Sequence, residues 1–149
     1  AEKALSQGID RPILLSLSKT IEAKKSNYYN ALENAQRSLE ITQWINYFVD
    51  VILHAQQDTE NQIDFVLKKT MFFYRFRDKF SERQTKVIRR MLEEGPRGFV
   101  GGINASKYGT LTKISKATAT RDLQDLLAIE AIIPLGESGG RSTRYEVNL

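Results

Sequence analysis

The sequence predicts a mainly α-helical chain with one small antiparallel β-hairpin near its C-terminus. Apolar residues recur at intervals of three and four along most of the chain as far as Leu127, which is typical of amphipathic helices. An apolar run at 131–133 and a Gly-rich loop at 136–140 follow the last helix, and the segment 144–147 can pair with that run. The order helix, strand, flexible loop and strand is typical of a winged helix-turn-helix, a module that usually binds DNA or a partner protein.

The composition excludes several classes of protein. With 149 residues, of which 41% are hydrophobic, the chain can form one domain or two small ones and is not expected to be disordered. It has no cysteine, which excludes disulfides, thiolate metal sites and a cysteine nucleophile. The net charge of +4 permits weak association with nucleic acid. Because no signal peptide and no membrane-spanning apolar run occur, we expect a soluble, cytoplasmic protein without membrane contacts.

The positive charge lies mainly in the C-terminal part of the chain. Residues 81–149 contain 11 Lys or Arg and 8 Asp or Glu, a net charge of +3, whereas residues 1–80 contain 11 and 10. The chain opens on Ala1, without an initiator Met and directly in a helical apolar pattern. We therefore expect a fragment of a longer protein.

The spacing of apolar residues predicts four helices before residue 80. They cover about residues 2–8, 17–36, 41–53 and 58–76. The N-cap of the second helix is Ser16 or Ser18, and the polar stretch 56–62 leads from the third helix into the fourth. We expect the aromatic side chains of the last two helices to form core rather than a base-stacking surface.

Capping residues divide the remaining chain into three helices and a wing. Ser81, with Gln84 three residues later, forms a capping-box pattern, and Asn104 and Ser115 are the expected N-caps of the next two helices. The expected elements are helices at about 82–93, at 105–108 and from 116 onward, a short strand at 99–100, and wing strands at 132–133 and 144–147.

The third of these helices is the candidate recognition helix. Its apolar residues from Ala119 to Leu127 share one face, which leaves Arg121 and Gln124 on the opposite face. Since Arg and Gln can form bidentate hydrogen bonds to guanine and adenine, we expect these two side chains to reach base edges. The side chains expected to contact phosphates are Lys113, Ser115, Lys116, Thr118, Arg141 and Arg144, the last two from the wing.

A role in protein interaction fits this helix equally well. Asp122 and Asp125 offset much of the positive charge of Lys116 and Arg121, whereas a helix that reads DNA usually carries a larger basic excess. Two hypotheses therefore stay open for the partner of the module. One is double-stranded DNA, and the other is a target protein, a homodimer or a regulatory contact. An enzyme activity of the chain itself is a third hypothesis.

Two sets of residues resemble known bacterial families. The run ISKATATRDL at 114–123 resembles the recognition helix of DeoR-type repressors, a match that is common among winged helices. The runs LSLS, YYNAL and ITQWINYF within residues 15–48 resemble, in order and spacing, the helices that close a Fic domain. In many bacterial Fic proteins a winged helix follows, with a pattern like FSERQ at 80–84. The resemblance implies C-terminal Fic helices and a connecting helix in residues 1–80, and a winged helix-turn-helix in residues 81–149.

The same resemblance limits the chemistry that is expected. Fic enzymes transfer AMP from ATP to a protein hydroxyl with a motif of the form HPFx(D/E)GNGR, in which the His is the base, the acidic residue holds Mg²⁺ and the glycine-rich part cradles phosphates. That motif is absent, and the single histidine, His54, is followed by Ala55. The resemblance implies that ATP and Mg²⁺ are cofactors of a parent protein adenylyltransferase. This fragment is expected to have no cofactor, no metal and no catalytic residue.

Overall fold

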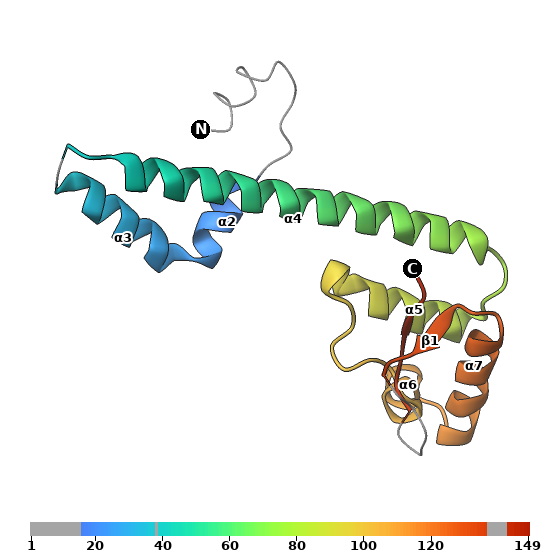
Figure 1. Ribbon diagram of the computed structural model, residues 1–149. Coiled ribbons are helices and arrows are strands. Elements are labelled where there is room, and N and C mark those ends of the chain that lie inside the picture. Colours follow the sequence, from blue (N-terminus) through green and yellow to red (C-terminus); the bar gives the residue numbers. More distant parts are fainter. Residues whose placement is uncertain (1–15, 38, 137–142) are drawn as a thin grey trace. The chain divides into compact units, whose positions relative to one another are not determined.

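The computed structural model describes residues 16–37, 39–136 and 143–149 (Figure 1). The described part is mainly α-helical with one two-stranded antiparallel sheet, as the sequence predicts. The chain forms two compact units, Ala1–Ile63 and Asp64–Leu149. The helix predicted at 2–8 lies outside the described residues.

The first unit has a small core between two of its three helices, the first and the third. It contains α2 (Leu17–Ala23), α3 (Lys25–Gln36) and the first part of α4 (Thr42–Arg75). Its buried residues are Leu17, Val51 and Ala55. The helix predicted to run without a break to residue 36 is divided at Lys24, whose φ of −133° and ψ of 47° are not helical. The end at Gln36 is as predicted.

Helix α4 is one continuous helix of 34 residues, where the sequence analysis expected two. The polar stretch 56–62 continues the helix because its side chains bond along it. Gln56 Nε2 donates to Glu60 Oε1 at 2.9 Å, and Thr59 Oγ1 donates to the Ala55 carbonyl at 2.8 Å. Without a Gly or Pro, polarity alone does not end a helix.

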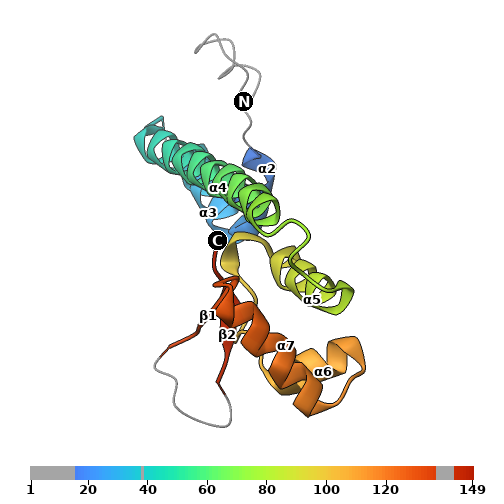
Figure 2. The ribbon, with the colours of Figure 1, turned by 90° about the vertical axis from the view of Figure 1, so that its right-hand side faces the viewer.

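The second unit has the element order of a winged helix. After α4 come α5 (Glu82–Glu93), the 3₁₀ turn η1 (Gly95–Arg97), α6 (Ala105–Thr112), α7 (Lys116–Ala128), β1 (Ile132–Pro134) and β2 (Tyr145–Val147). Figure 2 shows the three helices α5, α6 and α7 on one side of this unit and the hairpin on the other. The core is continuous from the end of α4 to the hairpin. Its buried members are Phe72, Phe76, Val87, Ile88, Met91, Leu92, Ile103, Tyr108, Ala119, Leu123, Leu126, Ala131 and Ile132.

The three predicted N-caps of this unit are confirmed. The Gln84 N–H donates to Ser81 Oγ, and the Ser81 N–H donates to Gln84 Oε1 at 2.8 Å, which completes the capping box of α5. Asn104 accepts from the N–H of Lys107, and Ser115 accepts from the N–H of Thr118. Helix α6 runs to Thr112, four residues beyond the predicted end.

The predicted hairpin is confirmed, but the strand predicted at 99–100 is wrong. β1 and β2 pair with Ile132 opposite Val147 and Pro134 opposite Tyr145. Ile103, rather than Phe99 or Val100, extends this sheet through two backbone hydrogen bonds with Tyr145, of 2.9 and 2.8 Å. The reason is a turn before Ile103, closed by a 2.8 Å bond from the Gly102 N–H to the Phe99 carbonyl.

A substitution at Gly102 tests the geometry of this turn. Its φ is +61°, and a Cβ at this position would lie 2.8 Å from the Tyr145 carbonyl oxygen. We expect Gly102→Ala to lower the free energy of unfolding by about 2 kcal/mol or more, because positive φ and a backbone clash act together. Equilibrium denaturation followed by circular dichroism measures the loss.

Gly101→Ala is the matched control for that experiment. Gly101 has a φ of +67°, but the atoms nearest an added Cβ are the flexible side-chain ends of Arg144 and Lys107, at 3.3 and 3.8 Å. Only the backbone cost of about 1 kcal/mol remains there. Equal losses in the two variants would contradict the close approach of Gly102 to the sheet.

Candidate nucleic-acid interface

Helix α7 has one buried face and one exposed face. Ala119, Leu123 and Leu126 are buried and Leu127 is half-buried, as the helical spacing predicts. The exposed side chains include those of Lys116, Ala117, Arg121, Gln124 and Asp125. The predicted division of the helix into an inward and an outward face is therefore correct for these residues.

The side chain of Asp122 is buried, whereas the sequence analysis counts its charge against that of the exposed cations. It is 7% exposed and accepts hydrogen bonds from two other helices. On α5, Arg83 Nε lies 3.1 Å from Oδ2 and Arg83 Nη2 lies 3.3 Å from Oδ1. On α6, the Tyr108 hydroxyl donates to Oδ2 at 2.9 Å. The negative charge of Asp122 is therefore compensated by Arg83 and does not offset the exposed cations of α7.

The electrostatic consequences appear on both partners of Asp122. The hydrogen bond to the carboxylate, followed by its charge, raises the pKa of Arg83 above its ordinary value. Burial, followed by the hydrogen bond to Asp122, raises the pKa of Tyr108 well above its ordinary value. Both groups therefore stay protonated over the whole neutral range, and both remain donors to Asp122.

The network also includes the start of α5. The side chain of Gln84, already part of the capping box, donates from Nε2 to the backbone carbonyl of Asp122 at 3.2 Å. One residue thus caps α5 and binds the middle of α7. The sequence held a signal for this arrangement, since residue 122 comes three residues after 119 and four before 126, which places it at the edge of the buried face of the helix.

The outward face of α7 is left with free cations. The side chains of Lys116, Arg121 and Gln124 form no hydrogen bond or ion pair with any residue in the described part of the chain. Asp125 is the one acidic side chain of α7 that is exposed. The exposed part of the helix is therefore more basic than its sequence suggests.

The turn before α7 brings further predicted residues to the start of that helix. Lys113 is exposed and adopts a left-handed conformation, with φ of 57° and ψ of 44°, as the C-cap of α6. Ser115 Oγ accepts from the Thr118 N–H at 3.2 Å and lies 3.0 Å from Thr118 Oγ1. The two hydroxyls are thus bonded to each other as part of the helix cap, and the exposed helix N-terminus favours anions beside them.

The wing contributes Arg144 to the described surface. Its side chain is exposed, and Nη1 lies 3.3 Å from the position that a Cβ on Gly101 would occupy. Arg141, the other predicted wing contact, lies outside the described residues, as does most of the Gly-rich loop.

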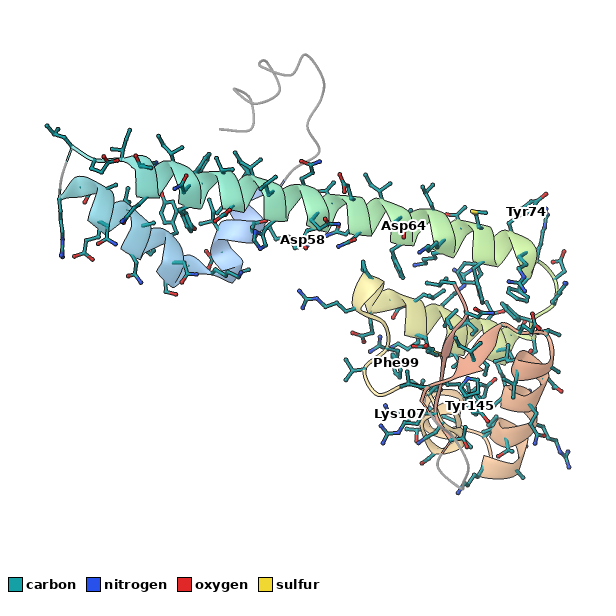
Figure 3. The ribbon with its side chains drawn as sticks, viewed as in Figure 1. Asp58, Asp64, Tyr74, Phe99, Lys107 and Tyr145 are labelled. Carbon is teal, nitrogen blue, oxygen red and sulfur yellow. The ribbon has the colours of Figure 1, made fainter. Side chains whose placement is uncertain are left out.

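Lys107 is a cation near the wing that the sequence analysis did not single out. Its Nζ donates to the carbonyls of Val100 and Gly102, at 3.2 and 3.0 Å, and lies 5.1 Å from the centre of the Phe99 ring. Figure 3 shows Phe99, Lys107 and Tyr145 gathered at this place. Lys107 therefore stabilises the turn that precedes Ile103.

Candidate metal ligands do not come together among the described residues. They contain no group of three or more His, Cys, Asp or Glu side chains placed to hold a metal ion. His54 Nδ1 lies 2.7 Å from the backbone carbonyl of Asp50, one turn earlier in α4. Within the described ranges, no helix is both long and apolar enough to cross a membrane.

No model of a known protein family matches the sequence, and no curated protein matches it.

Asp122 and Asp125 form a matched pair of acids on α7. We expect Asp122→Asn to lower the free energy of unfolding by about 2 kcal/mol, because the buried bond from Tyr108 then reaches a neutral acceptor. Asp125→Asn should change it by less than about 0.5 kcal/mol, since that side chain is exposed. Urea denaturation measures both variants, and a harmless Asp122→Asn would contradict a structural role for the network.

Tyr108 makes stability depend on pH in the alkaline range. Because the pKa of Tyr108 is raised in the folded state, its contribution is complete below the unfolded tyrosine pKa of about 10 and is lost as the pH rises above that value. We expect Tyr108→Phe to be less stable at pH 7 and to show a shallower loss of stability above pH 10. Tyr74→Phe, at an exposed tyrosine, is the control and should keep the wild-type slope.

Proposed function

We propose that residues 81–149 form a winged-helix module that binds double-stranded DNA, with α7 as the recognition helix. The observation that carries the proposal is the division of charge on α7. Arg121, Lys116 and Gln124 are exposed and unpaired in the described part of the chain, whereas the carboxylate of Asp122 is withdrawn to Arg83. Of the two acidic residues of α7, only Asp125 is therefore left to offset the positive charge of the exposed face.

The chemistry of the exposed face suits duplex DNA. An α-helix fits the major groove, where Arg can bind guanine and Gln can bind adenine through paired hydrogen bonds. Lys113 and Lys116 lie at the N-terminal end of α7, where phosphates are favoured by the helix dipole as well as by the side chains. Arg144 of the wing supplies a further phosphate contact, and Arg141 is proposed as another.

We further propose that the chain is the C-terminal part of a bacterial Fic-type protein adenylyltransferase and contributes recognition rather than catalysis. Support comes from the Fic-like runs in residues 15–48 and from the absence of an HPFx(D/E)GNGR motif in the sequence. Ile41, just before α4, and Ile45, Val49 and Leu53 in its first half are also about half exposed. Such a stripe suits a helix that packs inside a larger helical domain. ATP, Mg²⁺ and the transfer chemistry would belong to that domain, in the cytoplasm.

Docking of a protein is the second candidate for the winged unit. Ile129, Ile133 and Leu135 follow α7 and are each more than a third exposed. Residues 81–149 also carry a net charge of only +3, with 11 basic and 8 acidic residues. A target protein, or a regulatory contact with a catalytic domain, would use this apolar edge and would need little net charge.

Binding to duplex DNA tests the first proposal on the full chain. We expect Arg121→Ala to weaken binding to a preferred duplex by about tenfold to a hundredfold, which corresponds to about 1–3 kcal/mol. Lys116→Ala should weaken binding to all duplexes and lower the salt slope by about one. Asp125→Asn should strengthen binding, because it removes the one exposed acid of α7.

Arg97→Ala is the matched control. Arg97 is an exposed arginine in η1, after α5 and away from α7 in the sequence, so its removal lowers the net charge without touching the recognition helix. Fluorescence anisotropy at low and at physiological salt distinguishes the outcomes. Equal effects of Arg97→Ala and Arg121→Ala would contradict recognition by α7 and would favour the protein-docking candidate.

A further inference from the structure

The second half of α4 carries an apolar stripe on its outer side. Its members are Ile63, Val66, Leu67, Met71 and Tyr74, which are between 47% and 82% exposed. Their spacing of three and four residues places them on one face of the helix. Phe72 and Phe76 on the opposite face are buried in the core of the winged unit. Figure 3 shows Tyr74 projecting from α4 on the side away from α5, α6 and α7.

No described side chain buries this stripe, and the surface next to it is hollowed. Met71 and Tyr74 line a groove of about 500 Å³ together with Leu149, whose side chain is itself exposed. A continuous apolar surface of this kind on a stable helix is unfavourable in water and is typical of an interaction site.

The charged side chains beside the stripe indicate which kind of partner suits it. Glu60 and Asp64 come first, and Lys68 and Arg75 follow further along the helix. At about 100° per residue, Asp64, Lys68 and Arg75 lie on the same side of the apolar stripe, and Glu60 lies in line with Leu67 and Met71. Asp64 and Lys68 form an ion pair of 2.8 Å on the helix surface. Arg75 also forms an exposed ion pair of 3.6 Å with Glu130. The edge itself is thus acidic toward the N-terminus and basic toward the C-terminus.

We propose that this stripe binds the same stripe of a second copy of the chain, with the two α4 helices antiparallel. In that orientation the acidic end of one helix faces the basic end of the other, so Glu60 approaches Arg75 of the second copy and Asp64 approaches Lys68. In a parallel pair the charged edge of one helix would face the opposite edge of the other, so these charges would not meet. The antiparallel pair is therefore the arrangement that satisfies both the apolar stripe and the charges.

The geometry of the pair follows from twofold symmetry. The two Leu67 side chains lie near the twofold axis, and Ile63 of one copy lies opposite Met71 of the other copy. The spacing of three and four residues is the one that packs two helices side by side with interlocking side chains. This self-association uses α4 alone, so it stands whether or not α7 binds DNA.

Sedimentation of the full chain tests the proposal. We expect the wild type to dimerise reversibly, and Leu67→Glu to weaken the dimer by about a hundredfold or more, because each dimer then loses two buried leucines. Val49→Glu is the matched control, since Val49 is 47% exposed on the first half of the same helix and lies outside the stripe. A wild type that stays monomeric at its highest soluble concentration, or a dimer lost in Val49→Glu but kept in Leu67→Glu, would overturn the proposal.

Charge exchange and cross-linking test the orientation. Glu60→Arg and Arg75→Glu should each weaken the dimer, and the double variant should restore it, because the exchanged charges again face each other. The chain has no cysteine, so single cysteines report cleanly. Leu67→Cys should form a disulfide dimer on oxidation, whereas Ile63→Cys should not, since its two copies lie about 12 Å apart along the antiparallel pair. Efficient cross-linking through Ile63→Cys would show a parallel pair and overturn the antiparallel one.

Discussion

The carboxylate of Asp122 joins the three helices of the winged unit and fixes the orientation of the helix that it belongs to. It receives Arg83 from α5 and Tyr108 from α6, and its backbone carbonyl receives Gln84. A buried carboxylate is unfavourable unless it accepts hydrogen bonds. Rotation of α7 by one residue, about 100°, would break the bonds of Asp122 with Arg83 and Tyr108, so these bonds fix the orientation of the helix. The hydrogen bonds of Asp122 on the buried side of α7 thereby determine which residues of α7 face solvent.

The same interaction links the exposed face of α7 to the start of α5. Gln84 closes the capping box with Ser81 and also binds α7, so the N-terminus of α5 and the middle of α7 belong to one hydrogen-bonded group. Just before it, Phe80 packs on Phe76 with ring centres 5.4 Å apart. Arg121 and Gln124 therefore lie on a helix that is hydrogen-bonded to both neighbouring helices, and the proposed binding of base edges would need such a fixed position because a bidentate hydrogen bond tolerates little displacement.

Local chemistry predicted most of the fold, and long-range contacts account for most of what it missed. Ser81, Asn104 and Ser115 marked three helix starts correctly because a cap acts within three residues. The pairing of Ile103 with the sheet is not predicted from the sequence, because its partner Tyr145 lies more than forty residues away. The pairing of Asp122 with Arg83 and Tyr108 is not predicted from the sequence for the same reason, as these partners lie 39 and 14 residues away. The exposed positions of Lys116, Arg121 and Gln124 followed from helical spacing alone, but their freedom from ion pairs did not.

The most direct test of a DNA-reading α7 held in place by Asp122 is a map of backbone amide chemical shifts during titration of the full chain with duplex DNA. The account predicts that the changes concentrate on residues 113–125 and on Arg144, while the amides of η1 and of Ile133 and Leu135 remain unchanged. Changes centred on Ile129, Ile133 and Leu135, or no change beyond that caused by salt, would contradict it.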